Sequence, residues 1–136
     1  MRAVFDDTLI TGNDMIDSQH KELIDKINDL LIACEENKGT DEVLKMLTYL
    51  KDYTNFHFRA EEKFQEEIGY PGLKEHRQKH AEFVQTVDKL AETAKGGITP
   101  EFTQAVQQEV IDWLYYHIQG FDRSVAEYRF IRETLM

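Results

Sequence analysis

The sequence is poor in cysteine, proline and glycine, with one, two and seven of these among 136 residues. A single thiol, Cys34, cannot form a disulfide within the chain and excludes a metal site built from several cysteines. So few prolines and glycines are atypical of disordered or all-β chains. The sequence also lacks a secretory signal and any run of about 18 apolar residues, the length that a membrane-spanning helix needs. We therefore expect a soluble, cytoplasmic, helical protein.

Basic side chains are also in the minority. Lys and Arg number 16 against 26 Asp and Glu, so the net charge is −10 with neutral histidines. A chain this acidic is repelled by the phosphates of nucleic acids and by anionic membrane surfaces. We therefore expect neither nucleic acid nor a membrane among its partners.

Apolar residues recur at helical spacing in four long segments. The first begins after Asp17 and Ser18, and the second begins at Thr40, which can cap it. The fourth has the strongest start signal, because Thr99 precedes a proline at the first helical position. In numbers, the segments cover 17–38, 40–68, 73–94 and 100 onward, and the pattern continues into a helical extension near the C-terminus.

Long helices with short connections pack antiparallel to their neighbours. The sequence thus predicts an all-α protein, an up-down-up-down antiparallel four-helix bundle. The turn-forming cluster at 11–14 blocks a continuous helix at the start of the chain, so residues 1–16 are expected to form an irregular arm. This arm and the helical bundle of 17–136 make up a single domain, 1–136.

The five histidines carry the functional signal, because all of them fall on the apolar stripes of the predicted helices. One buried histidine is commonly a core residue bonded to a carbonyl or carboxylate. Five unconnected imidazoles would cost about 1 to 3 kcal/mol for each one left unsatisfied. Coordination of a metal removes that cost for the whole set, which consists of His20, His57, His76, His80 and His117.

Spacing adds acidic residues to this set. His76 and His80 lie one helical turn apart, as do His57 and Glu61, so each pair shares a helix face. Glutamate is rarely buried unless it is paired or ligated, which makes Glu61 a candidate ligand, whereas its neighbour Glu62 is expected to point to solvent.

His117 and Asp122 are five residues apart, which on a regular helix separates them by about 140°. Either Asp122 points to solvent, or a π-type turn around Gly120 aligns the two residues. We favour the π-type turn. Five imidazoles and two carboxylates are too many ligands for one tetrahedral zinc, and they fit two metal ions bridged by carboxylates.

The pattern resembles the hemerythrin family over nearly the whole chain, and it is most similar to a stand-alone bacterial hemerythrin. The residues that carry the resemblance lie in four segments, each containing candidate ligands. They are Ile16-Asp17-Ser18-Gln19-His20, His57-Phe58-Arg59-Ala60-Glu61-Glu62, Gly69-Tyr70-Pro71-Gly72 with His76 and His80, and Trp113-Leu114-Tyr115-Tyr116-His117 through Asp122.

The resemblance implies a non-heme di-iron centre with an oxo or hydroxo bridge. In such a centre His76, His80 and His117 bind one iron, His20 and His57 bind the other, and Glu61 and Asp122 bridge the two. The second iron then keeps one open position for dioxygen. The resemblance also implies an oxygen pocket with a wall formed by Phe58, Trp113 and Leu114, although these residues could equally be plain core.

The function implied is reversible dioxygen binding, for storage, delivery or sensing, and not enzymatic turnover. Two alternatives stay open at the level of sequence. A di-iron enzyme could act on nitric oxide or peroxide at the same centre, and an iron reserve could donate metal for cluster repair. A metal-free structural bundle would leave the buried imidazoles and Glu61 unexplained.

Overall fold

The structure is a computed structural model that describes the backbone of residues 3–135 and the side chains of 3–120, 122–125 and 127–131. Three long helices come first, α1 (Asp14–Glu35), α2 (Thr40–Ile68) and α3 (Leu73–Ala94). A fourth rod then runs without a break through α4 (Pro100–Val106), η2 (Gln107–Asp112), α5 (Trp113–His117), η3 (Ile118–Asp122) and α6 (Arg123–Leu135). Residues 1, 2 and 136 of the predicted domain lie outside the described residues.

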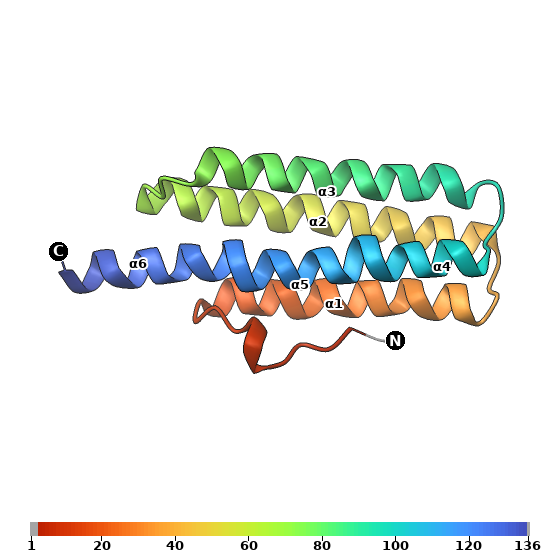
Figure 1. The fold of residues 1–136 in the computed structure, drawn as a ribbon, viewed down its shortest axis with the longest axis horizontal. Helices are drawn as coiled ribbons and strands as arrows, with labels where there is room; N and C mark the ends of the chain where they lie inside the picture. Colours follow the sequence, from red (N-terminus) through yellow and green to blue (C-terminus); the bar gives the residue numbers. More distant parts are fainter. Residues whose placement is uncertain (1–2, 136) are drawn as a thin grey trace.

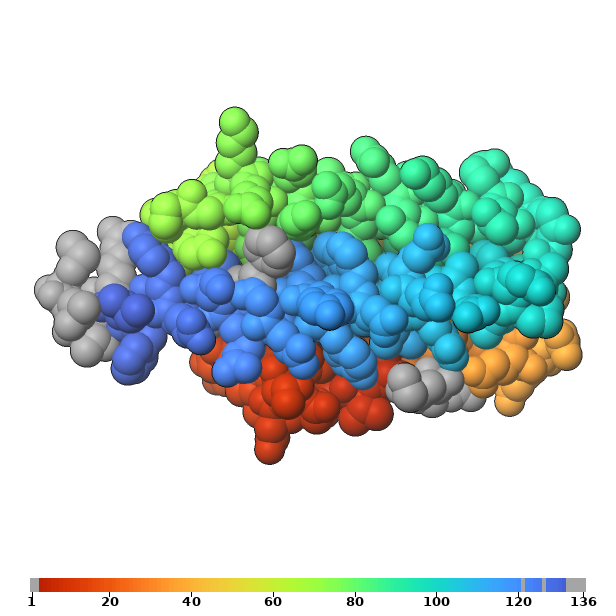
Figure 2. Space-filling view, viewed as in Figure 1, coloured from red at the N-terminus to blue at the C-terminus, as the bar shows by residue number. Residues whose placement is uncertain are grey.

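The four rods alternate in direction, as Figure 1 shows, so the predicted up-down-up-down bundle is confirmed. Apolar side chains from α1, α2, α3 and the fourth rod form one continuous core. The α6 end of the fourth rod projects beyond the turn between α2 and α3 (Figure 1). In the space-filling view, the fourth rod lies between α3 on one side and the N-terminal arm on the other (Figure 2). No helix in the described part of the chain is long and apolar enough to cross a membrane.

Helix starts differ from the sequence prediction in two places. Helix α2 begins at Thr40, but Thr40 does not cap it, because Gly39 occupies the capping position and no side chain accepts a hydrogen bond there. Thr99 caps α4 as predicted, because its side chain accepts a hydrogen bond from the amide of Phe102. Helix α1, however, begins three residues earlier than expected, because Asn13 caps it by accepting from the amide of Ile16. Asp17 then lies within the helix and accepts from the amide and hydroxyl of Thr11. That contact ties the arm to α1, close to the site described below.

The arm includes a short 3-10 helix, η1 (Asp7–Leu9), and is otherwise irregular, as predicted up to the start of α1. Leu9 is fully buried, and Asn28 of α1 exchanges hydrogen bonds with the backbone of Ala3. The arm is therefore packed onto the bundle along its length.

The fourth rod contains two π-helical segments, of which the sequence predicted one. Segment η3 starts directly after His117 and ends at Asp122, where the five-residue spacing called for a π-type turn. Asp122 is buried, so the alternative that it points to solvent is wrong. Segment η2, which ends at the exposed Asp112, has no counterpart in the sequence analysis.

Candidate metal centre

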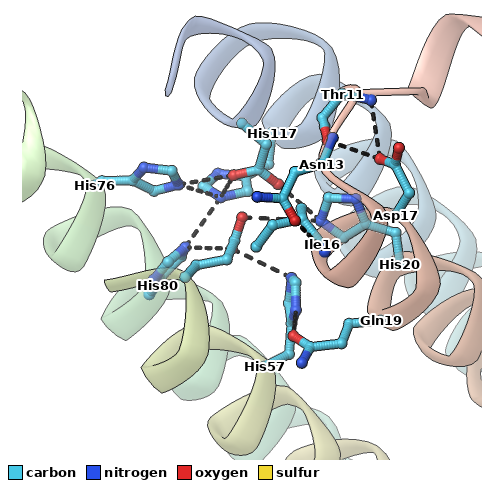
Figure 3. A network of polar contacts seen from close by, with 12 residues as sticks. Thr11, Asn13, Ile16, Asp17, Gln19, His20, His57, His76, His80 and His117 are labelled. Carbon is cyan, nitrogen blue, oxygen red and sulfur yellow. Dashed lines mark hydrogen bonds and ion pairs between the residues drawn. The ribbon is translucent and has the colours of Figure 1, made fainter. Parts of the chain in front are cut away.

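All five histidines are buried, and their side chains converge between the helices from four different rods (Figure 3). His20 comes from α1, His57 from α2, His76 and His80 from α3, and His117 from α5. The Nε2 atom of His117 lies 2.8 Å from that of His76 and 3.1 Å from that of His80. Lone pairs that face one another so closely repel unless a proton or a metal cation lies between them.

Two buried carboxylates stand among these nitrogens. Glu61 Oε1 lies 3.2 Å from His57 Nε2 and 3.3 Å from His80 Nε2. Asp122 reaches three imidazoles. Its Oδ1 lies 2.9 Å from His76 Nε2 and 3.2 Å from His117 Nε2, and its Oδ2 lies 3.0 Å from His20 Nε2.

These donors form two groups, each with ligand atoms within 4.8 Å of one another. The larger group has three imidazoles and the smaller has two, and both contain the same two carboxylates. Each carboxylate touches imidazoles of both groups, as a bridging ligand between two ions would. The groups are Glu61, His76, His80, His117 and Asp122, and His20, His57, Glu61 and Asp122.

Several of these atoms are fully enclosed and, although they lie close to other atoms of the site, make no hydrogen bond of suitable geometry. They include both oxygens of Asp122, Oε1 of Glu61 and both ring nitrogens of His20. A buried polar atom without a partner costs about 1 to 3 kcal/mol, so a protein rarely retains such a cluster. Imidazole and carboxylate are also the donors that iron prefers in proteins. The residues present therefore fit a pair of metal ions.

Burial keeps the lone pairs of three of the imidazoles available. Burial lowers the pKa of His57 to about 4, and burial with the nearby His117 and His76 lowers the pKa of His80 to about 2. Burial also lowers the pKa of His117. These rings are neutral at pH 7, which is the form that binds a metal.

The two carboxylates respond differently to the same burial. Burial and the neighbouring Asp122 raise the pKa of Glu61 well above its usual range. Burial opposes ionisation of Asp122 as well, but His117, His20 and His76 together hold the pKa of that carboxyl well below its usual range. The metal-free pocket thus tolerates one carboxylate anion and disfavours a second, and bound cations would supply the missing positive charge.

Three of the imidazoles have an outward-facing contact at Nδ1, which the sequence analysis missed. His57 Nδ1 lies 2.8 Å from Gln19 Oε1, an acceptor, whereas His76 Nδ1 lies 2.7 Å from Gln65 Nε2, an amide nitrogen that donates to it. Such outer contacts fix the orientation of a ligating ring. The sequence could have predicted the contact of Gln65, because Gln65 lies four residues after Glu61 and so shares the helix face of His57 and Glu61.

The third outer contact corrects a prediction. Glu62 was expected to point to solvent, but its Oε2 lies 2.8 Å from His80 Nδ1 and its side chain is only 22% exposed. Two helices in contact, α2 and α3, bring the residues together, and spacing along a single helix could not have revealed this.

Two of the three residues predicted to form an oxygen pocket, Phe58 and Trp113, lie against the candidate ligands. The ring of Phe58 stacks on His80 with 3.7 Å between centroids, and the ring of Trp113 stacks on His117 at 4.5 Å. Leu114, which follows Trp113 in the sequence, is fully buried in the core. Phe58 also approaches the smaller group, with its centroid 5.8 Å from that of His57.

Residues 11–128 match the sequence profile of the family described as "Hemerythrin HHE cation binding domain". A bacteriohemerythrin from Stenotrophomonas maltophilia (strain R551-3) is 31% identical over 124 residues, covering 91% of this chain and 79% of that protein. A bacteriohemerythrin from Campylobacter jejuni (serotype O:23/36, strain 81-176) is 28% identical over 117 residues, covering 86% of this chain and 87% of that protein. The solved structure of a hemerythrin mutant superposes with a TM-score of 0.73 at 26% identity, covering 88% of this chain and 89% of the other.

Proposed function

The chain belongs to the hemerythrin family, and from this premise we propose that it binds dioxygen reversibly at a pair of iron ions. The observation that carries the proposal is the pair of donor groups that share Glu61 and Asp122. In this assignment one ion is held by His76, His80 and His117 and the other by His20 and His57. Glu61 and Asp122, which belong to both groups, would contribute to holding both ions.

The unequal donor count supports binding of a small ligand at one ion only. The larger group offers five protein donors and the smaller offers four. Iron in such sites takes about six ligands, so the ion of His20 and His57 retains room for an exogenous molecule. When bound, the iron pair would supply the electrons for a reversible reduction of dioxygen.

The surrounding side chains favour binding over turnover. Phe58, Trp113 and Leu114 place apolar surface around the donors, and apolar walls keep water and its protons away from the bound molecule. Five neutral imidazoles also stabilise high-valent iron less well than a carboxylate-rich set. We propose that these three residues form the wall of the oxygen pocket.

An anaerobic absorption titration tests the function. The protein is reduced, loaded with ferrous iron and checked for two ions per chain, after which oxygen is admitted, removed and admitted again. A visible band that appears with oxygen and disappears on its removal over several cycles is the expected result.

Two other results would contradict the proposal. Steady consumption of nitric oxide or peroxide, with many turnovers per centre and no reversible oxygen band, would identify an enzyme. Iron that passes rapidly to a weak chelator would identify a reserve.

A further inference from the structure

Glu62 and Arg77 form an ion pair that reaches from the protein surface to one imidazole of the centre. Glu62 Oε2 contacts His80 Nδ1 at 2.8 Å, and Glu62 Oε1 accepts a hydrogen bond from Arg77 Nε at 3.1 Å. The other end of the guanidinium, Nη2, donates to Glu66. Glu62 and Glu66 lie one turn apart on α2, so both can accept from Arg77 of α3, the neighbouring helix in Figure 1.

This contact differs in charge from the other two outer contacts. Gln19 and Gln65 present neutral amides to His57 and His76, whereas Glu62 presents a carboxylate to His80. A carboxylate that holds the Nδ1 proton makes the opposite nitrogen, Nε2, a stronger donor to a metal. Of these three rings, His80 therefore receives the most electron density.

The ring of His80 is also restrained on its other sides. Phe58 covers one face, with the two rings inclined by only 2°. The Nε2 atom points at His117 and Glu61 inside the centre. Since a flipped ring would lose the contact between Nδ1 and Glu62, the carboxylate selects the orientation in which Nε2 faces the metal.

Arg77 limits the effect of that carboxylate. Its side chain is about half exposed, at 48%, and Arg77 remains charged at any ordinary pH. A guanidinium on Oε1 draws negative charge away from Oε2, and it also holds the carboxylate in place. Arg77 thus fixes the position of the Glu62 carboxylate and reduces the negative charge that this carboxylate presents to His80.

We propose that Glu62 is a positioning residue for His80, and that the pair of Glu62 and Arg77 makes the ion of the three-histidine group easier to oxidise than neutral amides would. The inference rests on the metal-binding part of the proposed function and is independent of dioxygen. It predicts that removal of Glu62 and removal of Arg77 shift the reduction potential of the bound iron in opposite directions, because Glu62 adds negative charge near His80 and Arg77 withdraws it.

Zinc binding by chelator competition tests the positioning role in the whole chain without any redox chemistry. Glu62→Gln, which keeps a hydrogen-bond acceptor but loses the charge, should weaken binding of the zinc ion in the three-histidine group by about 10-fold, and Glu62→Ala by up to about 100-fold. The control is Glu92→Gln, which removes the same charge from an exposed ion pair between Glu92, near the end of α3, and Lys95, the residue that follows this helix. In the zinc-loaded protein, the protected Nδ1 proton of His80 should be visible by NMR and disappear in Glu62→Ala.

The reduction potential of the iron-loaded protein tests the electrical role. Glu62→Gln should shift the ferric-to-ferrous equilibrium about tenfold toward ferrous, and Arg77→Gln should shift it toward ferric. Shifts of the same sign, or zinc affinities of the Glu62 variants equal to that of the control, would overturn the inference and leave the proposed function intact. Failure of reversible oxygen binding, with these shifts still present, would overturn the function alone.

Discussion

Replacement of Asp122 by alanine tests the assignment of the centre most directly, because this carboxylate belongs to both donor groups. The change reduces the larger group from five protein donors to four and the smaller group from four to three. Loss of even an outer partner of a ligand costs 10–100-fold in metal affinity, so loss of a bridge should cost at least about 10-fold. We expect the ion of His20 and His57, which has fewer donors, to be lost first.

The same change affects the metal-free fold. Asp122 is buried within 3.2 Å of His20, His76 and His117, and removal of one partner from a buried charged cluster costs about 3–5 kcal/mol. For a domain of this size that corresponds to a melting temperature lower by about 10–20 °C. The helices should nonetheless persist, because the apolar core continues well beyond the site.

The assay is metal content after anaerobic iron loading, with circular dichroism to follow helix content and melting. Asp112→Ala is a matched control, because Asp112 also ends a π-helical segment, η2, but is exposed. We expect about one ion per chain in Asp122→Ala and two in Asp112→Ala. Retention of two tightly held ions in Asp122→Ala would refute the bridging assignment.

Three further predictions concern the core, the pH dependence and a helix cap. Leu114→Ala should lower the free energy of unfolding by about 2–5 kcal/mol and speed loss of the oxygenated form, and an unchanged autoxidation rate would remove Leu114 from the pocket wall. In the metal-free protein, burial lowers the pKa of His57 to about 4, against about 6.5 in an unfolded chain. Only the unfolded state then gains this proton between those values, so His57 by itself should lower the free energy of unfolding by up to about 3 kcal/mol as the pH drops from 7 to 4. Because the pKa of His80 is lower still and adds a further loss, His57→Gln should make the pH dependence shallower in urea titrations without abolishing it. Thr99→Ala should cost about 0.5–2 kcal/mol in thermal melts with iron content unchanged, since Thr99 caps α4 far from the ligands in sequence.

The helical spacing of apolar residues and the turn-forming residues between the segments were sufficient to predict the four-helix bundle. Apolar spacing located the four rods, and Thr99 with Pro100 marked the start of the last one correctly. The start of the first helix was misplaced, because Asn13 and Asp17 are both able to cap. The choice between them depends on whether Asp17 is occupied by the arm, as it is here through Thr11.

The sequence by itself also identified the candidate ligands. Histidines on apolar stripes, a buried Glu61 and a five-residue step to Asp122 are local properties of helices, and all these side chains are buried as expected. Helix periodicity does not encode how the donors divide into two groups that share their carboxylates, since that depends on distances between helices, and before the structure only the family resemblance had implied this division. Only the tertiary structure placed Glu62 against His80, because a contact between neighbouring helices depends on their rotation and relative height, which no periodicity along one helix encodes.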